Sequence, residues 1–261
     1  MAGFKDNWQD LGPRVASGVV MAVVFVGAVV WGGVPFALLV IAAGGLLTWE
    51  VARMARVAQP EVIGLVAAGL VAVALRLPEW ADVLLFALVA GAIFLGGKHD
   101  RKVLAIYGFF ALLACDAFWL IRGESLRLAL WLALVVVASD VMGYIAGRMI
   151  GGPKFWPAVS PKKTWSGTVA GWIGAAVVGV LIMPQAGWII VPVSVVMSFA
   201  GQMGDVAESA LKRRAGVKDS SNLIPGHGGV LDRFDALMGA ALVVEAFVLI
   251  GEAMFGVHGW R

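Results

Sequence analysis

Ionisable residues gather in one stretch near the end of a chain that is otherwise apolar. From Lys218 to Asp235 the sequence reads KDSSNLIPGHGGVLDRFD and holds three aspartates, a lysine, an arginine and a histidine. Asp232 and Asp235 stand three apart, so on a helix they share a face and can share a cation. Hard oxygen ligands in a chain with 3 histidines and 1 cysteine favour Mg²⁺ over zinc.

The glycines of this stretch surround its histidine. Pro225, Gly226, Gly228 and Gly229 forbid a regular helix around His227 and allow backbone to approach a ligand closely. A histidine set between glycines is therefore expected near a ligand rather than in a packed core.

A second acidic and basic group comes just before, in GDVAESALKRR. Asp205, Glu208, Ser209 and Lys212 are spaced i, i+3, i+4, i+7 and predict one face of a helix. Asp205 ends an apolar run and points the way Glu208 does, which makes it a metal-ligand candidate. The alternative for Glu208 and Lys212 is an ordinary surface pair worth roughly a few tenths of a kcal/mol.

The segment SPKKTWSG, residues 160–167, places two adjacent lysines before an apolar run. Pro161 ends any helix, and Thr164 is well placed to cap the next one. Lys162 and Lys163 beside a helix N-terminus predict a site for phosphate oxygens. The alternative is a basic anchor that contacts anionic lipid head groups.

The segment SDVMGYIAGRMIGG carries an aspartate inside an apolar run. Asp140, Tyr144, Gly147 and Gly151 follow helical spacing and are expected on one face. An aspartate in a membrane helix is costly unless paired or hydrated, so it indicates a functional site. A structural pair between Asp140 and an arginine, and a helix-packing role for the glycines, stay open alternatives.

Carboxylates for Mg²⁺ beside many cations for phosphates suit phosphoryl or nucleotidyl transfer. Catalysis of that kind consists mainly of positioning and charge neutralisation. The sequence has no GxxxxGK[ST] motif, which excludes a P-loop enzyme.

The elements that carry these residues are predicted to be membrane helices. The chain of 261 residues is 61% hydrophobic and 14% charged, against about 25% charged residues in soluble domains. We expect an all-α, polytopic membrane protein, since strand-like alternation is missing. The periodicity and apolar runs predict about nine transmembrane helices, over residues 14–32, 35–50, 62–76, 83–97, 103–121, 127–148, 167–184, 187–206 and 236–256.

The distribution of positive charge predicts the orientation of these helices. Sixteen of the 20 Lys and Arg residues fall on one side when the N-terminus is cytoplasmic, which satisfies the positive-inside rule. The C-terminus is then expected on the opposite side. The long polar connections 148–166 and 207–235 lie on the cytoplasmic side. The same rule explains the basic character of the chain, and no nucleic acid is expected as a partner.

The rest of the sequence indicates how the chain is organised but adds no further candidate for chemistry. Residues 1–130 are predicted to form an N-terminal membrane-helix region and 131–261 a catalytic membrane region, the two integrated as one unit. The opening residues are too polar for a signal peptide and are expected to be a cytoplasmic lead-in. Cys115 lies in an apolar run as the single cysteine, so no disulfide forms within the chain.

The segment SALKRRAGVKDSSNLIPGHGGVLDRFD, Ser209 to Asp235, resembles the signature of phosphatidate cytidylyltransferases (CDP-diacylglycerol synthases). SPKKTWSG and DVMGYIAGR resemble two further blocks of that family, at the expected places upstream. The resemblance covers about the C-terminal half, while residues 1–130 agree only in being membrane spans. Ser166 stands where the family usually has glutamate, and Gly143 where alanine is common.

The resemblance implies that CTP and phosphatidate react to CDP-diacylglycerol and pyrophosphate with Mg²⁺ in phospholipid biosynthesis. A second cation and a homodimer are left open. It implies a multi-pass enzyme of the cytoplasmic membrane whose active site faces the cytoplasm. The implied metal ligands are Asp205, Asp232 and Asp235, and the implied catalytic residues are Asp205, Asp232, His227, Lys212 and Arg233. The implied substrate-binding residues are Asp140, Tyr144, Ser160, Lys162, Lys163, Thr164, Ser209, Arg213, Lys218, Gly226, Gly228 and Gly229.

Three other functions compete with this one. Another membrane CTP-dependent lipid transferase or a lipid kinase would use the same groups. An ion-coupled transporter would place carboxylates near the midplane between inverted repeats, and Asp116 and Glu245 are the residues that favour it. A basic-surface scaffold explains the lysines and arginines but not the clustered aspartates or the histidine between glycines.

Overall fold

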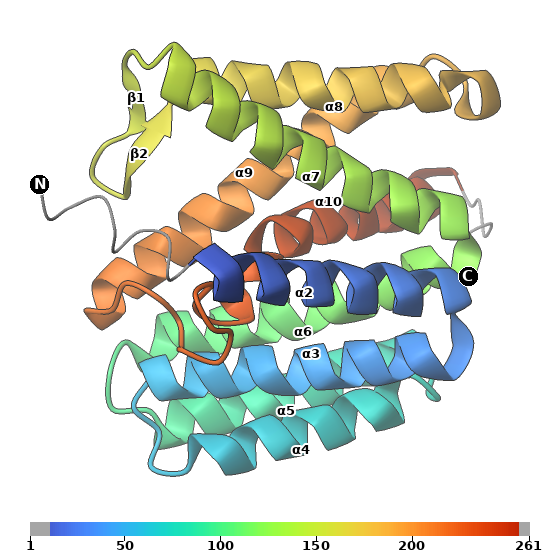
Figure 1. Ribbon diagram of the computed structural model, residues 1–261. Helices are drawn as coiled ribbons and strands as arrows, with labels where there is room; N and C mark the ends of the chain where they lie inside the picture. Colours follow the sequence, from blue (N-terminus) through green and yellow to red (C-terminus); the bar gives the residue numbers. More distant parts are fainter. Residues whose placement is uncertain (1–10, 256–261) are drawn as a thin grey trace, which may run out of the picture. The chain divides into compact units, whose positions relative to one another are not determined.

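The computed structural model describes the backbone of residues 11–255 and, within it, the side chains of 15–78 and 80–250. The expectations for residues 1–10 and for the C-terminus lie outside these residues. Within them the chain forms nine helices and one short hairpin (Figure 1). The helices are α2 Leu11–Trp31, α3 Gly33–Met54, α4 Pro60–Ala74, α5 Glu79–Gly96, α6 Arg101–Glu124, α7 Leu126–Met149, α8 Trp165–Ala186, α9 Ile190–Ala215 and α10 Leu231–Phe255.

Each span predicted from the sequence coincides with one of these helices. Among the described residues, five helices are long and apolar enough to cross a membrane, namely α3, α6, α7, α8 and α9. This is the pattern of a multi-pass helical membrane protein. The total of nine spans and the sides of the two termini stay predictions. The largest difference at a helix end is in α9, which continues nine residues beyond the predicted end at 206 and reaches Ala215.

The prediction of an all-α fold is wrong at one place. Strands β1 Lys154–Trp156 and β2 Ser160–Thr164 form an antiparallel hairpin with an irregular register between α7 and α8 (Figure 1). Pro153, Pro157 and Pro161 interrupt any helix in this connection. A T-shaped contact between the rings of Phe155 and Trp165, with centroids 4.9 Å apart, fastens the hairpin to the start of α8.

The chain packs as two compact units. Unit 1 contains the chain up to Asp116 together with Arg214–Phe234, and unit 2 contains Ala117–Arg213 and the chain from Asp235 onward. The loop between α9 and α10, residues 216–230, therefore belongs to unit 1. The functional division predicted at residue 130 stays a prediction, because packing alone does not say where the chemistry lies.

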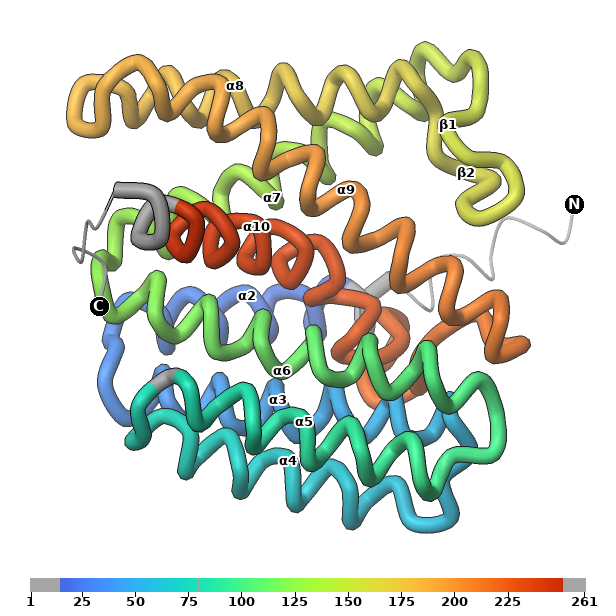
Figure 2. Tube along the Cα trace, turned by 180° about the vertical axis from the view of Figure 1, so that it is seen from behind, coloured from blue at the N-terminus to red at the C-terminus, as the bar shows by residue number. Residues whose placement is uncertain are grey.

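Close helix contacts in each unit depend on glycine. In unit 1, α3, α4 and α5 run side by side (Figure 2), and a Cβ on Gly45 would lie 3.0 Å from the carbonyl oxygen of Gly64. In unit 2, α7 packs on α8, and a Cβ on Gly143 would lie 3.1 Å from the carbonyl oxygen of Gly167. Helices in lipid associate through such small residues. The helix-packing role considered for the glycines of α7 is therefore correct for Gly143.

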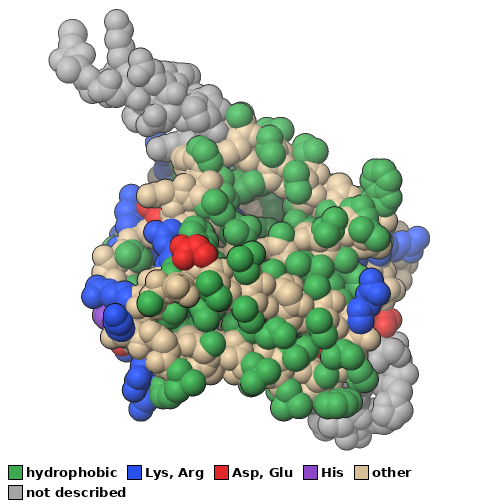
Figure 3. Space-filling view, turned by 90° about the horizontal axis from the view of Figure 1, so that it is seen from below, with side chains coloured by type: hydrophobic (Ala, Val, Ile, Leu, Met, Phe, Trp, Pro, Cys, Tyr) green, Lys and Arg blue, Asp and Glu red, His purple; other side chains and the backbone are tan. Residues whose placement is uncertain are grey.

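The outer face of α4 and α5 is apolar. Leu65 is 75% exposed, and Leu88 and Leu84 are exposed as well. Figure 3 shows apolar side chains across the middle of this face, with most Lys and Arg side chains toward its edges. A water-soluble protein seldom exposes so large an apolar area, whereas a lipid-facing surface requires it.

Candidate active site

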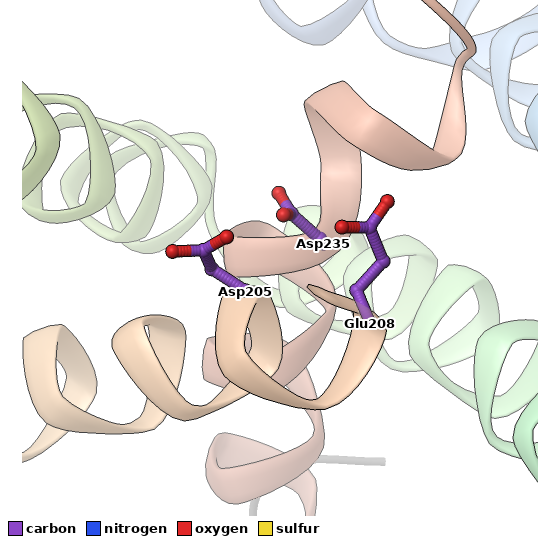
Figure 4. Close-up of side chains that lie close together, drawn as sticks. All are labelled: Asp205, Glu208 and Asp235. Carbon is purple, nitrogen blue, oxygen red and sulfur yellow. The ribbon is translucent and has the colours of Figure 1, made fainter. Parts of the chain in front are cut away.

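Three carboxylates from two helices meet in unit 2. Asp205 and Glu208 extend from α9 and Asp235 from the first turns of α10 (Figure 4). One ligand oxygen of each lies within 4.8 Å of the others. Such a group of hard oxygen donors can hold Mg²⁺. The sequence predicted Asp205 and Asp235 as ligands of this kind, whereas Glu208 was not among the predicted ligands.

The surface pair considered for Glu208 and Lys212 is in fact buried. The Glu208 side chain is 0% exposed and that of Lys212 is 13% exposed, and Lys212 Nζ lies 2.6 Å from Glu208 Oε2. The surface alternative was wrong because α9 is packed along this face rather than standing out in water. A buried pair of this kind holds both groups in a fixed place, and removing one partner is costly.

Glycines allow α9 and α10 to approach each other beside the carboxylates. A Cβ on Gly204 would collide with the backbone of Asp235 and lie 3.2 Å from the Cα of Gly239. Because neither glycine has a side chain, the backbone of Asp235 lies directly against α9. The close contact places the Asp235 carboxylate next to those of Asp205 and Glu208.

A cavity of about 450 Å³ opens beside Asp205. Its wall combines carboxylates, hydroxyls and cations from α7, the hairpin, α8 and α9. The lining residues are Ser139, Asp140, Gly143, Tyr144, Gly147, Arg148, Ser160, Lys162, Lys163, Thr164, Gly167, Thr168, Gln202 and Asp205. The cavity thus brings together Asp140, Tyr144, the 160–164 segment and Asp205, which were predicted from three separate motifs.

Two cations of the cavity have fixed positions. Lys163 on β2 donates from Nζ to Asp205 Oδ2 at 2.7 Å and to the carbonyl of Gln202 at 3.1 Å. Arg148 donates to the hydroxyl of Tyr144 at 2.9 Å. The hairpin therefore carries a lysine from the connection after α7 to the carboxylate of α9.

A buried amide organises the floor of the cavity. Gln202 donates from Nε2 to the carbonyl of Thr168 at 3.2 Å and to Ser139 Oγ at 3.3 Å. Its Oε1 accepts a hydrogen bond from Trp172 Nε1 at 3.1 Å. With both ends of the amide occupied, its orientation is determined. Sequence reasoning passed over Gln202, although a polar residue inside the apolar run 187–206 is a recognisable signal.

Helix α8 begins with the N-cap that the sequence predicts. Thr164 Oγ1 accepts from the backbone N–H of Gly167 at 3.2 Å, which makes it the N-cap.

Helix α7 ends at Met149, so Gly151 does not share its face as expected. Gly151 has a φ of +66°, which favours glycine and leaves the helix. Its carbonyl accepts from Ser166 Oγ at 2.5 Å, a contact that fixes the residue standing where the resembling family has glutamate.

The 216–230 loop of unit 1 contains a tight turn around the histidine. Ile224 and Gly228 pair across it, while Gly226 and Gly228 have φ values of +75° and +84°. The prediction that glycines prevent a helix here is confirmed. Arg233 donates to the carbonyl of His227 from Nη2 at 2.6 Å and from Nε at 3.0 Å, so its guanidinium holds the turn.

Helix α2 fixes the imidazole of His227. Ser17 Oγ donates its one proton to the carbonyl of Pro225 at 3.0 Å and lies 2.8 Å from His227 Nδ1. A hydroxyl whose proton is already donated can only accept, so we assign a proton to Nδ1. No sequence pattern pointed to Ser17, because the bond joins residues 210 positions apart.

Two carboxylates hold the end of the loop in unit 1. Asp232 Oδ2 accepts from the backbone N–H groups of Ser220 and Gly229 and from the Ser220 hydroxyl, at 2.8–2.9 Å. Glu50, on α3, accepts from the Ser220 and Ser221 hydroxyls and from two further backbone N–H groups. The sequence predicted Asp232 as a metal ligand, and that role stays a prediction.

The remaining predicted residues divide between the two units. Ser209 lies on α9 near the carboxylates, and Arg213 is exposed farther along that helix. Lys218 is exposed at the start of the loop in unit 1. His227, Asp232, Arg233 and the loop glycines also belong to unit 1, whereas the cavity and the three-carboxylate group belong to unit 2.

Comparisons with known proteins cover nearly the whole chain. The model of the cytidylyltransferase family matches residues 12–250. The phosphatidate cytidylyltransferase of Brucella abortus biovar 1 (strain 9-941) is 34% identical over 253 residues, which is 92% of this chain and 93% of that protein. The phosphatidate cytidylyltransferase of Staphylococcus saprophyticus is 43% identical over 122 residues, 45% of this chain and 47% of that protein.

Proposed function

The chain belongs to the cytidylyltransferase family, and on this premise we propose that it transfers the cytidylyl group of CTP to phosphatidate. The products are CDP-diacylglycerol and pyrophosphate, and the reaction is a step of phospholipid biosynthesis. The relatives named above carry this activity in their names, and the match of the family model over residues 12–250 includes the cavity and the carboxylates.

One observation carries the proposal at the level of the site. Asp205 belongs both to the three-carboxylate group and to the wall of the cavity that Lys162 and Lys163 line. Groups able to hold a metal and groups able to hold phosphates therefore border the same space. That combination supports transfer between two phosphate-bearing substrates, because both must be brought together against their charge repulsion.

The reaction needs little acid or base catalysis. An oxygen of the phosphatidate phosphate attacks the α-phosphorus of CTP and forms a new P–O–P bond. The bond between the α-phosphorus and the oxygen bridging to the β-phosphorus breaks, and its electron pair leaves with pyrophosphate. A phosphate monoester is already a competent nucleophile, so positioning and neutralisation of charge dominate.

The residues of the cavity suit these tasks. Lys162, Lys163 and Arg148 would bind phosphate oxygens, and the hydroxyl of Ser160 would donate a further hydrogen bond. Lys163 is already held by Asp205 and the Gln202 carbonyl, so its ammonium group is preorganised and loses little freedom when a phosphate arrives.

Mg²⁺ fits the three-carboxylate group. Oxygen donors alone, close enough together to share one ion, are what this cation requires. Asp205, Glu208 and Asp235 would hold it, and when bound it supplies positive charge that offsets the charge of the phosphates. Lys163 and Lys212, paired with Asp205 and Glu208, reduce the repulsion among the carboxylates before the ion arrives.

The membrane setting agrees with a lipid substrate. The cavity is lined from α7, α8 and α9, three of the helices long and apolar enough to cross a membrane. We place the site on the cytoplasmic side of the cytoplasmic membrane, because the Lys and Arg distribution favours that side and CTP is a cytoplasmic nucleotide.

The test uses the purified full-length protein in detergent with Mg²⁺, CTP and phosphatidate. We expect pyrophosphate release that requires both substrates, with CDP-diacylglycerol as the lipid product. A lipid kinase would give CDP in place of pyrophosphate, and an ion-coupled transporter would give no turnover of either substrate. Absence of pyrophosphate from well-folded protein would refute the proposal.

A further inference from the structure

Glu50 is a buried carboxylate that the proposed chemistry does not use. It lies near the C-terminal end of α3 and is 0% exposed. An ionised carboxylate inside a membrane helix costs several kcal/mol or more unless donors satisfy it. The donors around Glu50 therefore decide whether its charge can be held in this position.

The donors come from the 216–230 loop and the start of α10. Glu50 Oε1 accepts from Ser221 Oγ at 2.5 Å and from the Val230 N–H at 2.9 Å. Glu50 Oε2 accepts from the Leu231 N–H at 2.7 Å and from Ser220 Oγ at 3.0 Å. One side chain of the third helix thus binds both ends of a loop some 170 residues later in the chain.

The bonds of Glu50 continue into those of Asp232. The Ser220 hydroxyl lies 3.0 Å from Glu50 Oε2 and 2.8 Å from Asp232 Oδ2, so its one proton is shared between two carboxylates. The Gly229 N–H donates to Asp232 as well. A Cβ on Gly229 would collide with Ser220 Oγ and the Glu50 carboxylate, which explains the glycine at this position.

Regular secondary structure contributes little to holding the loop in place. Its described backbone contains a single isolated bridge, between Ile224 and Gly228. Glu50 holds the segments on either side of that bridge, Ser220–Ser221 before it and Val230–Leu231 after it. The turn that carries His227 and the helical turn that carries Asp232 are therefore both placed by Glu50.

We infer that Glu50 is a positioning residue for the cytidylyl transfer, one that fixes the 216–230 loop and the first turn of α10 without touching a substrate. The inference rests on the proposed function for its catalytic part. Its structural part, the anchoring of the loop, is independent of which reaction the protein performs.

The test compares four full-length proteins in detergent: wild type, Glu50→Gln, Ser221→Ala and Glu61→Gln. Glu50→Gln replaces one acceptor oxygen by an NH₂ group that cannot accept from the loop N–H groups. Ser221→Ala removes one donor and leaves the carboxylate in place. Glu61, an exposed glutamate at the start of α4, serves as the matched control. The measurements are kcat at saturating substrates, apparent Tm, and amide hydrogen exchange of residues 218–231.

We expect Glu50→Gln to lower kcat by about 30- to 100-fold, the order of loss produced by a small misplacement of groups at a site. Exchange of 218–231 should become faster while the other helices exchange as in wild type. Ser221→Ala should show the same pattern with a kcat loss of about 10-fold, at the lower end for one hydrogen bond to a charged group. Glu61→Gln should match wild type in every measurement.

Two results would overturn the inference. One is wild-type kcat in folded Glu50→Gln. The other is a Glu50→Gln protein that unfolds as a whole while Ser221→Ala keeps full kcat and full loop protection, since Glu50 would then serve only overall folding. Failure of wild type to release pyrophosphate would refute the proposed function instead, and the exchange data would still decide whether Glu50 holds the loop.

Discussion

Carboxylates meet in both units of the structure, in opposite surroundings. In unit 2, Asp205, Glu208 and Asp235 have ligand oxygens within 4.8 Å of one another. Lys163 pairs with Asp205 and Lys212 pairs with Glu208, while Asp235 Oδ1 accepts from the N–H of Ala236. In unit 1, Glu50 and Asp232 accept from backbone N–H groups and serine hydroxyls at 2.5–3.0 Å. Both groups bring carboxylates together from separate helices, yet most of their partners differ in kind.

The difference in partners separates a binding role from an anchoring role. Backbone N–H donors cannot move away without unfolding the segment that carries them, so carboxylates bound to them fix a structure. A lysine ammonium group has three donors, so Lys163 can contact a phosphate without leaving Asp205, and a cation can join the carboxylates while α9 stays folded. The carboxylates of unit 2 are therefore suited to binding a cation, and those of unit 1 to anchoring the 216–230 loop. Four substitutions can break or sharpen this contrast.

The largest effect is expected from Asp205→Asn. The change removes one of the charges that would hold Mg²⁺ and also the partner of Lys163. We expect kcat to fall by about 10³-fold, the upper range for loss of an electrostatic group at a reacting centre, and the Mg²⁺ concentration for half-maximal rate to rise. Pyrophosphate release measured over a Mg²⁺ titration gives both quantities. An unchanged Mg²⁺ requirement would exclude Asp205 as a metal ligand.

Asp232→Asn tests whether Asp232 binds a metal ion, as proposed for the carboxylates of unit 2, or anchors the loop, as Glu50 does. The sequence predicts a metal ligand, while the structure shows its Oδ2 bound to Ser220 and Gly229. We expect a loss in kcat of about 100-fold together with a higher Mg²⁺ requirement, because the change removes the negative charge that a cation ligand supplies. A loss in kcat at wild-type Mg²⁺ requirement would assign Asp232 to anchoring alone, as expected for Glu50→Gln.

Ser17→Ala tests an anchor that carries no charge. Without the hydroxyl, His227 Nδ1 loses its acceptor and the Pro225 carbonyl loses a donor. We expect kcat to fall by about 10-fold, the size of one or two ordinary hydrogen bonds, with the Mg²⁺ requirement unchanged. Ser125→Ala is the control. Ser125 caps α7 far from His227 in the sequence, and the loss of this cap costs about 1 kcal/mol of stability. Equal kcat losses in both variants would mean that stability, not the imidazole, is being measured.

Most of the helical architecture and the wall of the cavity could be predicted from the sequence. Apolar runs long enough for a membrane are a strong local signal, and Asp140, Tyr144, Lys163 and Asp205 stood out as polar residues at the ends of such runs. What could not be predicted depends on contacts between distant residues. Nothing in the sequence says that a serine at 17 meets a histidine at 227.

Two residues were missed although a local signal existed. Glu50 and Gln202 each place a polar side chain within an apolar run, which by itself indicates a paired group. The pairing partners, however, are a loop and a neighbouring helix that only the fold brings close. Glu208 was misjudged for a related reason, because its spacing to Lys212 is equally typical of an exposed helix face.

The smallest effect is expected from Asp100→Asn, which supplies the baseline of an exposed carboxylate. Asp100, between α5 and α6, pairs with Arg214 at 2.8 and 2.9 Å, with 28% and 54% of the two side chains exposed. Its φ of +41° is tolerated by asparagine, so the change removes only the charge. At neutral pH we expect wild-type kcat and an apparent Tm lower by roughly 1–2 °C, as for an exposed pair.

The pH dependence of this small effect has a definite sign. The hydrogen bond from Arg214 lowers the pKa of Asp100 below its ordinary 3.8, so the stabilisation is present above pH 3.8 and is lost as pH falls through the lowered pKa. The difference in apparent Tm between wild type and Asp100→Asn should therefore persist from pH 7 down to about pH 4 and vanish as the pH falls through the lowered pKa of Asp100. Two results would contradict this expectation. One is a Tm difference that grows on acidification, and the other is a kcat loss comparable to that of Glu50→Gln. Either would show that solvent exposure does not distinguish the weakly stabilising Asp100 from the anchoring carboxylates.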